Sequence, residues 1–519
     1  MNIIKSGFNI ASVTLISRLL GFFRDILIAA TLGTGVIADA FFMAFKFPNI
    51  FRRLFAEGAL SAAFIPIFSR KLTVSKLNAK KFASETVSVL FWFLLILTTI
   101  AEIFMPYIIY MIAPGFMEDP EKLNLTITLT RIAFPYLLFM SLIALISGIL
   151  NSIEKFTAAA ALPIVLNMVL ILFLIIILKI NIPNTPLAAK YLISGVFVSG
   201  LLQLLLIVYI CKKTGYLPSI KIPKLTPGVK KFLFLGFPAV IAGGITQINL
   251  LIGSIIASFE NGAISYLYYA DRIYQLPLAL IGITIGTILL PELSRNYKIK
   301  DFTKASFTQN RALGLALTMA IPAAFGMIVL SFDIIHVLFE RMNFTSADTL
   351  STSHALIAFS YGLPAFILIK ILQSNFFAKE NTLTPMWFAL VSAIINIMLS
   401  IILFKKIGFV GIAVSTSISA WANTILLLLA ISRAKDIIFD NKIKINFLLA
   451  IVCSSIMVGF LYFVKKNILV IEKYFYSDLY SFLILSFYVL MGIIIYWATA
   501  HMTGLLNTKE IAKKFRKTK

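Results

Sequence analysis

The chain has 519 residues, of which 60% are hydrophobic and only 13% charged, and its mean hydropathy is +0.96. Soluble domains carry about 45–50% apolar and about 25% charged residues, so this composition excludes a soluble enzyme. Lys and Arg total 46 against 22 Asp and Glu, which gives a net charge of +24. In a soluble protein that charge would indicate nucleic acid, but a membrane protein collects cations in its cytoplasmic loops. We therefore expect an all-α integral membrane protein with no nucleic-acid partner.

Fourteen segments are predicted to cross the membrane as helices, because each holds about 20 mostly apolar residues. Arg18 interrupts the first apolar run, and we interpret that run as a retained helix rather than a signal peptide. The first two segments carry charges in their middle, so a pair of interfacial amphipathic helices stays open as the alternative. The fourteen segments are residues 9–33, 37–66, 83–113, 124–150, 158–178, 191–211, 232–258, 263–290, 312–332, 352–378, 384–404, 407–432, 445–464 and 479–503.

The distribution of Lys and Arg over the loops predicts which side of the membrane each loop faces. With the N-terminus placed in the cytoplasm, the inside segments hold 29 cations and the outside segments hold 9. Cytoplasmic loops are enriched in cations, so this asymmetry supports both the number of spans and their orientation. Both termini are predicted to be cytoplasmic.

Eight cations remain inside the predicted spans. A charge at the bilayer centre costs about 2.5–3.5 kcal/mol and usually faces an internal cavity. The planar fork of arginine stays charged when desolvated and matches phosphate, so several converging arginines with too few carboxylates would require an anion. We therefore predict a cavity for a phosphate or diphosphate headgroup. The eight cations are Arg18, Arg24, Lys46, Arg52, Arg53, Arg131, Arg272 and Lys370.

The acids of the same spans offer an alternative in which each arginine is held in a structural pair. Asp25 follows Arg24 directly and is expected to point elsewhere. Arg53 and Glu57 are spaced i, i+4 and are expected to pair, which leaves Arg52 for a ligand. The acids that could pair with arginines of other spans are Asp25, Asp39, Glu57 and Asp271.

Three further cations are interpreted more conservatively. Arg131 opens a predicted span directly after a loop, where a structural role is expected. Lys46 and Lys370 could face the cavity, but a lone lysine near a span end usually extends to the interface. In the second span, Pro48 is expected to kink the helix, which a membrane helix tolerates where it lines a cavity.

Two parts of the chain resemble each other. Residues 66–70 read PIFSR and residues 291–295 read PELSR, 225 positions later, near the ends of the second and eighth predicted spans. Six spans per repeat predicts two lobes of the same orientation, related by an axis along the membrane normal. The predicted division is residues 1–215 for the first lobe, 216–435 for the second, and 436–519 for two additional helices and a basic tail.

Other classes of protein remain as alternatives with little support. A membrane enzyme acting on lipid-linked sugars would need a sizeable soluble loop with a catalytic constellation, and the longest loops span about 20 residues of this sequence. A channel would more naturally arise from a symmetric oligomer with rings of charge. Three scattered histidines and two cysteines in apolar runs, Cys211 and Cys453, predict neither a metal site nor a redox cofactor.

Several motifs together resemble the signature of the MurJ (MviN) family of lipid II flippases, which belongs to the multidrug/oligosaccharidyl-lipid/polysaccharide (MOP) exporter superfamily. The resemblance covers nearly the whole chain. The motifs are SRLLGFFRD at residues 17–25, ADAFF at 38–42, FKFPNIFRRLFAEGA at 45–59, APGF at 113–116, YYADR at 268–272 and GTILLP at 286–291.

The resemblance implies an alternating-access flippase of the bacterial inner membrane that moves lipid II to the periplasmic leaflet for cell-wall synthesis. It implies a central cavity between two six-helix lobes, with the last two helices forming a groove for the lipid tail. Transport would be driven by membrane potential or by a gradient of Na⁺ or H⁺, and no other cofactor is expected. We expect a monomer whose partners are lipid II, membrane lipids and possible cell-wall synthesis proteins. Another exporter of the same superfamily is the alternative.

The resemblance also assigns roles to residues that the charge pattern had isolated. It implies Arg18, Arg24, Arg52 and Arg272 as the headgroup-binding arginines and Asp39 as a functional acid. From their place in the spans, Asp25 and Glu57 are further candidates for acids of the cavity or gate. Secondary candidates are Lys46, Arg53, Asp271 and Lys370. Many relatives carry Glu where this chain has Gln275, so a carboxylate role in gating or proton coupling is doubtful at that position. We expect Arg24, Arg52 and Arg272 to hold the diphosphate, and Asp39 and Glu57 to hold the arginines when the cavity is empty.

Overall fold

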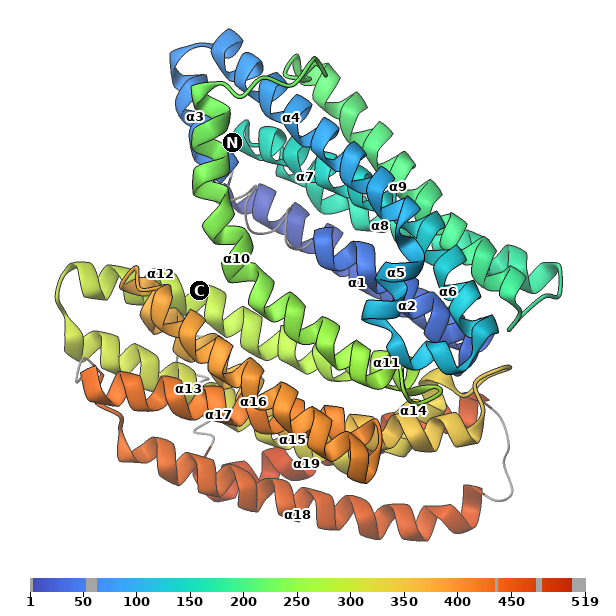
Figure 1. Ribbon diagram of the computed structural model, residues 1–519. Coiled ribbons are helices and arrows are strands. Elements are labelled where there is room, and N and C mark those ends of the chain that lie inside the picture. The colour runs from blue at the N-terminus through green and yellow to red at the C-terminus, as the bar shows by residue number, and fades with distance from the viewer. Residues whose placement is uncertain (1–2, 53–62, 435–436, 473–477, 506–519) are drawn as a thin grey trace. The chain divides into compact units, whose positions relative to one another are not determined.

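The computed structural model describes residues 3–52, 63–434, 437–472 and 478–505, and within these ranges the chain is helical with no strand (Figure 1). The helices up to residue 214 are α1 (Ile3–Leu32), α2 (Val36–Arg52), α3 (Ile65–Val74), α4 (Lys76–Ile103), α5 (Met105–Ile112), the 3₁₀ turn η2 (Pro114–Glu118), α6 (Pro120–Ala133), α7 (Tyr136–Ser152), α8 (Phe156–Lys179) and α9 (Pro186–Thr214). They are followed by α10 (Pro227–Ala257), α11 (Ala263–Pro277), the π-helix η3 (Leu278–Ile283), α12 (Thr284–Lys298), α13 (Phe302–Val329), α14 (Ser331–Phe339), α15 (Ser346–Ala378), α16 (Leu383–Ile407), α17 (Val410–Ala434), α18 (Asn441–Glu472) and α19 (Asp478–Met502).

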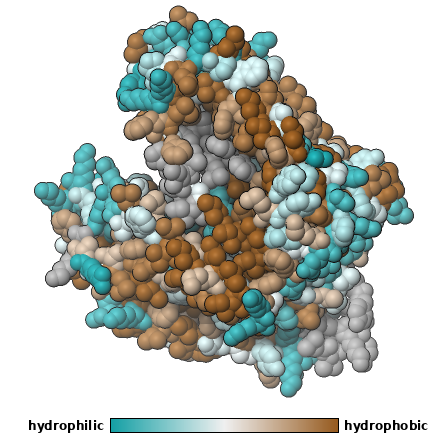
Figure 2. All heavy atoms as spheres, in the orientation of Figure 1, coloured by the Kyte–Doolittle hydropathy of each residue, from teal (hydrophilic) through white to brown (hydrophobic). Residues whose placement is uncertain are grey.

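Eleven helices of the described ranges are long and apolar enough to cross a membrane, which identifies a multi-pass membrane protein. The face shown in Figure 2 agrees, because apolar side chains cover much of the sides of the helices while hydrophilic ones gather toward their ends. The predicted first and seventh spans correspond to α1 and α10, which are 30 and 31 residues long but are not among the eleven. The number of fourteen spans therefore stays a prediction.

Prolines lie within two of the predicted spans. Pro48 lies inside α2, which ends at Arg52, and the next described helix, α3, begins at Ile65. The eighth predicted span changes helix type at its proline: α11 ends at Pro277, the π-helix η3 follows, and α12 completes the span. A proline lacks the N–H that would bond to the preceding turn, so a local change of helix type at this point is expected.

The chain forms two compact units, and each is described by itself. The first unit comprises Met1–Ser265 together with Arg341–Thr345. In it α1 packs along α8, α8 packs on α9, and α2 packs against α6. Packing along a spanning helix favours a spanning role for α1 over an interfacial one. The predicted lobe boundaries at residues 215 and 435 come from the sequence repeat. The division into compact units does not test that repeat, so these boundaries stay a prediction.

A short segment returns to the first unit and covers the end of α1. Asn343 donates from its backbone N–H to the Ala30 carbonyl at 3.2 Å and from Nδ2 to the carbonyls of Ala30 and Thr31 at 3.1 Å. These carbonyls belong to the last turn of α1, where no helical partner is present. Gly33 follows with φ +62°, and a Cβ there would lie 2.3 Å from the Asn343 carbonyl oxygen. Only glycine therefore fits this helix end.

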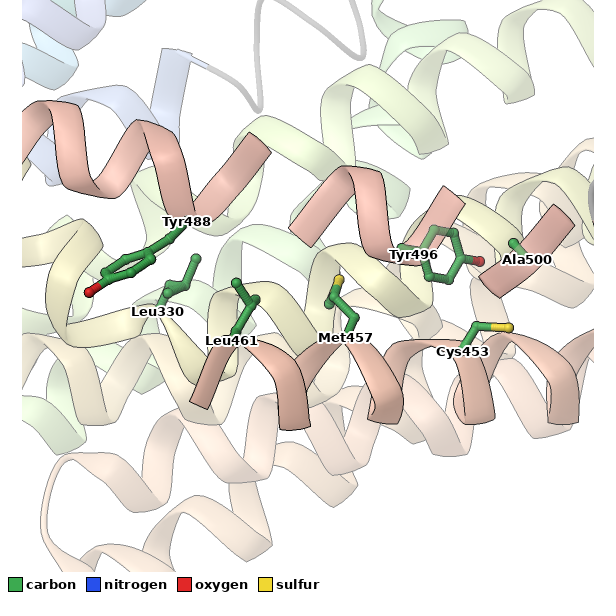
Figure 3. Packing of buried hydrophobic residues seen from close by; sticks show 7 residues of the cluster. All are labelled: Leu330, Cys453, Met457, Leu461, Tyr488, Tyr496 and Ala500. Atoms are coloured by element: carbon green, nitrogen blue, oxygen red, sulfur yellow. The ribbon is translucent and has the colours of Figure 1, made fainter. Parts of the chain in front are cut away.

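The second unit comprises Tyr266–Glu340 and Ser346–Lys519, and α15 is its central helix. Of the most apolar stretch of α15, 78% is buried, against α13 and α17 among other helices. The additional helices α18 and α19 attach to α13 through a core of seven buried side chains (Figure 3). The Tyr496 hydroxyl of α19 donates to the Thr318 carbonyl of α13 at 2.7 Å, so this attachment also has a polar bond. The core residues are Leu330, Cys453, Met457, Leu461, Tyr488, Tyr496 and Ala500.

Gly362 allows α15 and α17 to approach closely, and this contact gives a first prediction. A Cβ at Gly362 would lie 2.6 Å from Ser417 Oγ and 2.9 Å from Ser417 Cα. We expect Gly362→Ala to lower the free energy of unfolding by about 1–3 kcal/mol through overpacking. Gly459→Ala on α18 is the matched control, because nothing lies within 4 Å of its Cβ position. Thermal unfolding of the purified variants measures the difference, and equal stability of the two would contradict the assigned packing.

Candidate functional site

Arg24 on α1 is the most deeply buried of the predicted arginines whose side chains are described, with 6% of its surface exposed. Its Nε and Nη2 donate to Asp25 Oδ1 at 3.1 and 2.6 Å, and its Nη1 donates to Asn167 Oδ1 at 2.9 Å. Asp25 is also buried, so the two charges are paired inside the helix bundle. The expectation that Asp25 points away from Arg24 is wrong. The long arginine side chain bends back to its sequence neighbour, because in a buried setting each charge needs the other.

Asn167 of α8 is the residue of this group that the sequence analysis missed. It accepts from Arg24 and donates from Nδ2 to the Ser17 carbonyl at 2.9 Å, so it links α8 to α1 at two points. Gly21 faces it, and a Cβ there would lie 3.4 Å from Asn167 Nδ2. An asparagine within an otherwise apolar span was the available signal, since a buried amide requires partners.

The other predicted residues of the N-terminal spans differ in what the structure describes. Arg18 lies on α1 and is exposed. Arg52 is the last residue of α2, and its side chain is not described. Arg53 and Glu57 lie outside the described residues, so their i, i+4 pair stays a prediction. Lys46 of α2 is half-buried, and its ammonium donates to the Leu250 carbonyl at 3.2 Å and also to Ser254 Oγ, both on α10.

Asp39 on α2 is fully buried and accepts four hydrogen bonds. Its Oδ1 accepts from the backbone N–H and the hydroxyl of Ser265 at 3.0 and 2.9 Å. Its Oδ2 accepts from the Gly262 N–H and from the ammonium of Lys122, both at 2.8 Å. The two N–H groups stand at the start of α11, in its turn at residues 262–265 of the first unit. A carboxylate at this position satisfies N–H groups that have no helical partner, and its charge is favoured by the helix dipole.

Lys122 supplies the opposite charge to Asp39. It lies in the first turn of α6 with 4% of its surface exposed, bonds to Asn261 Oδ1 at 3.0 Å, and places its ammonium 4.3 Å from the centre of the Phe116 ring. In the sequence, Lys122 lies between the predicted spans 83–113 and 124–150, so it belongs to a loop assigned to the outside and not to the eight cations predicted inside spans. The expectation that Asp39 holds an arginine therefore differs from the structure, in which its cationic partner is Lys122.

The APGF motif contacts the segment that leads from α10 into this turn. The Gly115 N–H donates to Ser258 Oγ at 3.0 Å, and a Cβ on Gly115 would lie 2.4 Å from the Ser258 backbone. Glycine is therefore required by the close approach of η2 to the segment between α10 and α11. This contact and the Asp39 cluster hold that segment from two sides.

In the second unit, Arg272 and Asp271 have separate partners on α11. Arg272 Nη2 donates to the Tyr268 hydroxyl at 2.9 Å, and its guanidinium carbon lies 4.6 Å from the centre of the Tyr268 ring. The side-chain amide of Gln275 donates to Asp271 Oδ2. A glutamate at position 275 would place a second negative charge beside Asp271, so the glutamine replaces repulsion by a hydrogen bond. Lys370 lies on α15 and is exposed.

The structure thus brings some of the predicted residues together and leaves the full cavity a prediction. Arg24 with Asp25 forms one cluster of the first unit, and Asp39 with Lys122 forms another. Arg272 and Asp271 belong to the second unit, so convergence of arginines from both units on one ligand stays a prediction. Among the described residues, no group of His, Cys, Asp or Glu could hold a metal ion.

Comparison of the whole chain with known proteins identifies its family. Residues 28–487 match the family model described as "Lipid II flippase MurJ". The chain belongs to the MurJ family. It is 42% identical to a probable lipid II flippase MurJ of Rhizobium tropici over 90% of this chain and 88% of that protein. It is 39% identical to the Rickettsia prowazekii relative with the same name, over 98% of this chain and 99% of that protein.

Solved structures agree with membership of the MurJ family. A lipid II flippase MurJ in an inward-closed conformation matches 95% of this chain and 98% of its own with a TM-score of 0.79 and 30% identity. An inward-facing multidrug resistance MATE transporter of the MOP superfamily matches 83% of this chain and 98% of its own with a TM-score of 0.68. At 16% identity the second likeness shows the fold alone. Membership of the MurJ family identifies a transporter rather than an enzyme, which confirms that prediction.

The ion pair of Asp39 and Lys122 gives the second prediction. Lys122→Met would leave a buried carboxylate without its cation, and we expect this to lower the free energy of unfolding by about 3–5 kcal/mol. Asp39→Asn/Lys122→Met should be less destabilised than the sum of the two single changes, because neither charge is then left unpaired. The measurement is thermal unfolding of the purified protein.

Lys190→Met provides the matched control, because Lys190 is an exposed lysine of the same unit. It should change stability by less than about 0.5 kcal/mol. If Lys122→Met were as stable as Lys190→Met, the pair would have no structural role.

Proposed function

We propose that this chain moves lipid II across the bacterial inner membrane by alternating access, and that Arg24 is a binding group for its diphosphate. The observation that carries the proposal is the buried guanidinium of Arg24 on α1, a helix predicted to span the membrane, in a member of the MurJ family. Holding a cation there is costly, and an anionic substrate gives it a function. The diphosphate of a lipid-linked precursor supplies such an anion.

The contacts of Arg24 suggest how an anion would be exchanged. Two of its N–H groups bond to one oxygen of Asp25, and a third bonds to Asn167. A phosphate offers the same fork of acceptor oxygens as a carboxylate, with more charge. In our proposal the diphosphate replaces Asp25 at Arg24, while Asn167 keeps the guanidinium oriented. Asp25 then acts as the acid that holds the arginine when no substrate is bound.

The remaining candidates extend this proposal. Arg18 lies six residues before Arg24 on α1, about 9 Å along the helix axis, which suits a second phosphate or the sugar. Arg52 and Arg272 would add cations from α2 and α11. The last two helices would hold the lipid tail, as the resemblance to the family implies. The support for these roles comes from the sequence motifs and from the family. For Arg24, the contacts in the structure give additional support.

We further propose the setting of transport. Both termini face the cytoplasm, the chain works as a monomer, and cell-wall synthesis proteins receive the translocated lipid. Membrane potential or a gradient of Na⁺ or H⁺ drives the cycle. Support for the orientation comes from the excess of Lys and Arg in the loops assigned to the inside.

The third prediction tests the substrate role of Arg24. Arg24→Ala should fail to complement a strain depleted of its flippase and should leave lipid II on the cytoplasmic leaflet. The loss of charge-assisted bonds should weaken lipid II binding to the purified protein by at least about tenfold. Arg24→Lys, which keeps the charge but loses the fork, should be intermediate.

Arg131→Ala is the matched control, because Arg131 is an exposed arginine of the same unit and is expected to be structural. It should complement normally. Membrane levels and thermal unfolding identify any variant that fails to fold. Normal growth and normal lipid II binding by a well-folded Arg24→Ala would refute the proposed role. A protein stabilised by a drug or a polysaccharide lipid but not by lipid II would favour another exporter of the superfamily.

The fourth prediction concerns the energy source. In proteoliposomes, removing the membrane potential with valinomycin and balanced K⁺ should stop lipid II translocation if the potential drives it. Removing only the proton gradient with nigericin, or only Na⁺, should leave transport unchanged in that case. Sensitivity to nigericin alone would assign coupling to H⁺, and sensitivity to Na⁺ removal alone would assign it to Na⁺.

A further inference from the structure

The connection between α9 and α10, residues 215–226, lies against α4 (Figure 1). Four hydrogen bonds attach its backbone to one helix, and the longest is from Ser88 Oγ to the Ser219 carbonyl at 3.4 Å. Ser84 Oγ accepts from the Ser219 N–H at 3.0 Å, and Ser88 Oγ accepts from the Lys221 N–H at 2.8 Å. The indole of Trp92 donates to the Lys221 carbonyl at 3.1 Å. We call residues 215–226 the α9–α10 connection.

The spacing of these partners on α4 fixes the depth of the connection. Ser84, Ser88 and Trp92 are four residues apart, so they form one row on one face of the helix. The connection then turns back, because Thr226 Oγ1 donates to Glu85 Oε2 at 2.9 Å. Its central residues, 221–225, therefore lie at the level of Ser88 and Trp92.

This level is the boundary between polar and apolar parts of α4. Beyond Trp92, α4 exposes large apolar side chains, including Phe93 at 51% and Ile96 at 57%. Toward its start it carries Lys76, Lys80 and Lys81. Tryptophan is enriched at membrane–water interfaces, where its ring is apolar and its N–H is polar. A segment at this level of a membrane-spanning helix would meet both headgroups and acyl chains.

The outward side chains of the connection suit that environment. Ile220, Ile222 and Leu225 have 51%, 80% and 60% of their surfaces exposed. Lys221 and Lys224 alternate with them and are also exposed. Lys212 and Lys213 precede the connection and Lys230 and Lys231 follow it, and residues 212–231 contain no acid. An exposed apolar stretch flanked by cations is the pattern of a segment that binds an anionic membrane surface.

We propose that the α9–α10 connection is an interfacial lipid-binding segment. Ile220, Ile222 and Leu225 insert at the boundary of the acyl chains, and Lys221 and Lys224 bind the phosphate groups of anionic phospholipids in that leaflet. The ligand is a membrane phospholipid and not the transported lipid, so the inference goes beyond the proposed function. Because the backbone of the connection is bonded to α4, the lipids would hold α4 and the adjoining ends of α9 and α10 at a fixed depth.

The first experiment measures lipid preference at Trp92. The full chain is placed in nanodiscs of phosphatidylcholine with either brominated phosphatidylglycerol or brominated phosphatidylcholine, and quenching of Trp92 is obtained by difference from Trp92→Phe. We expect stronger quenching by the anionic lipid. Lys221→Gln/Lys224→Gln should reduce the apparent affinity for phosphatidylglycerol by about tenfold or more. Lys179→Gln/Lys190→Gln is the control, because Lys179 at the end of α8 and Lys190 near the start of α9 are exposed and lie at the other end of α9 from the connection. This double variant should leave the affinity for phosphatidylglycerol unchanged.

Two outcomes of this experiment would overturn the proposal. One is a preference for phosphatidylglycerol that survives in Lys221→Gln/Lys224→Gln. The other is loss of the preference in excess inorganic phosphate at constant ionic strength, which would indicate a site for a soluble anion. Because all four lysines are exposed, these variants should fold as the parent does, and thermal unfolding checks this.

The second experiment measures depth. Both native cysteines are buried, so a spin label attaches selectively to a cysteine introduced at Ile222 or, as the control, at Lys155 in the exposed α7–α8 loop. The label at position 222 should be protected from a water-soluble relaxation agent and accessible to oxygen, which concentrates in the bilayer. The label at position 155 should show the opposite. Equal accessibility to the water-soluble agent at both positions would overturn the proposed insertion.

Discussion

The structure depends on the hydrogen bonds and ion pairs that stabilise charged side chains buried within its helix bundle. An ionised group without a partner is costly in such a place, and the cost falls only when hydrogen bonds and an opposite charge surround it. Arg24 has Asp25 and Asn167 for this purpose, and Asp39 has Lys122 and three donors at the start of α11. Each cluster joins helices that are distant in the sequence. If Arg24 binds the substrate as proposed, the same charge would serve both the function and the assembly of the helices.

The Asp39 cluster combines two kinds of compensation. Its carboxylate closes the N-terminus of a helix, where N–H groups lack partners, and it neutralises a buried lysine. A movement that separated Asp39 from residues 262–265 would remove three of the four hydrogen bonds of the carboxylate and leave the N–H groups of Gly262 and Ser265 without their partner. Such a movement requires water or other polar groups to enter as the contact opens. A transporter that alternates between states needs contacts of this kind, which are stable when closed and can be replaced when hydrated.

Much of the fold was predictable from the sequence, while the partners within the site were not. Hydropathy predicts most spans, because about 20 apolar residues are needed for each crossing. The cations inside spans are also visible, and Arg24 was found this way. Lys122 was missed because a lysine counted as part of a loop folds back into the protein, and hydropathy does not detect such a return. Asp25 was misjudged because ideal helical angles describe where Cβ points and not where a long arginine side chain ends.

Neutral polar residues inside the spans have a different role from the charged ones, because several of them bond to backbone groups of neighbouring segments. Ser84, Ser88 and Trp92 bond to the backbone of the α9–α10 connection, which has no secondary structure of its own. A non-helical backbone near the membrane needs partners for its N–H and C=O groups, so an adjacent helix must supply them. Asn167 does the same for a guanidinium and for a carbonyl of α1. A charged residue in a spanning helix thus indicates a ligand or an ion pair. A row of neutral polar side chains, such as Ser84, Ser88 and Trp92, indicates that the backbone of another segment lies against that face of the helix.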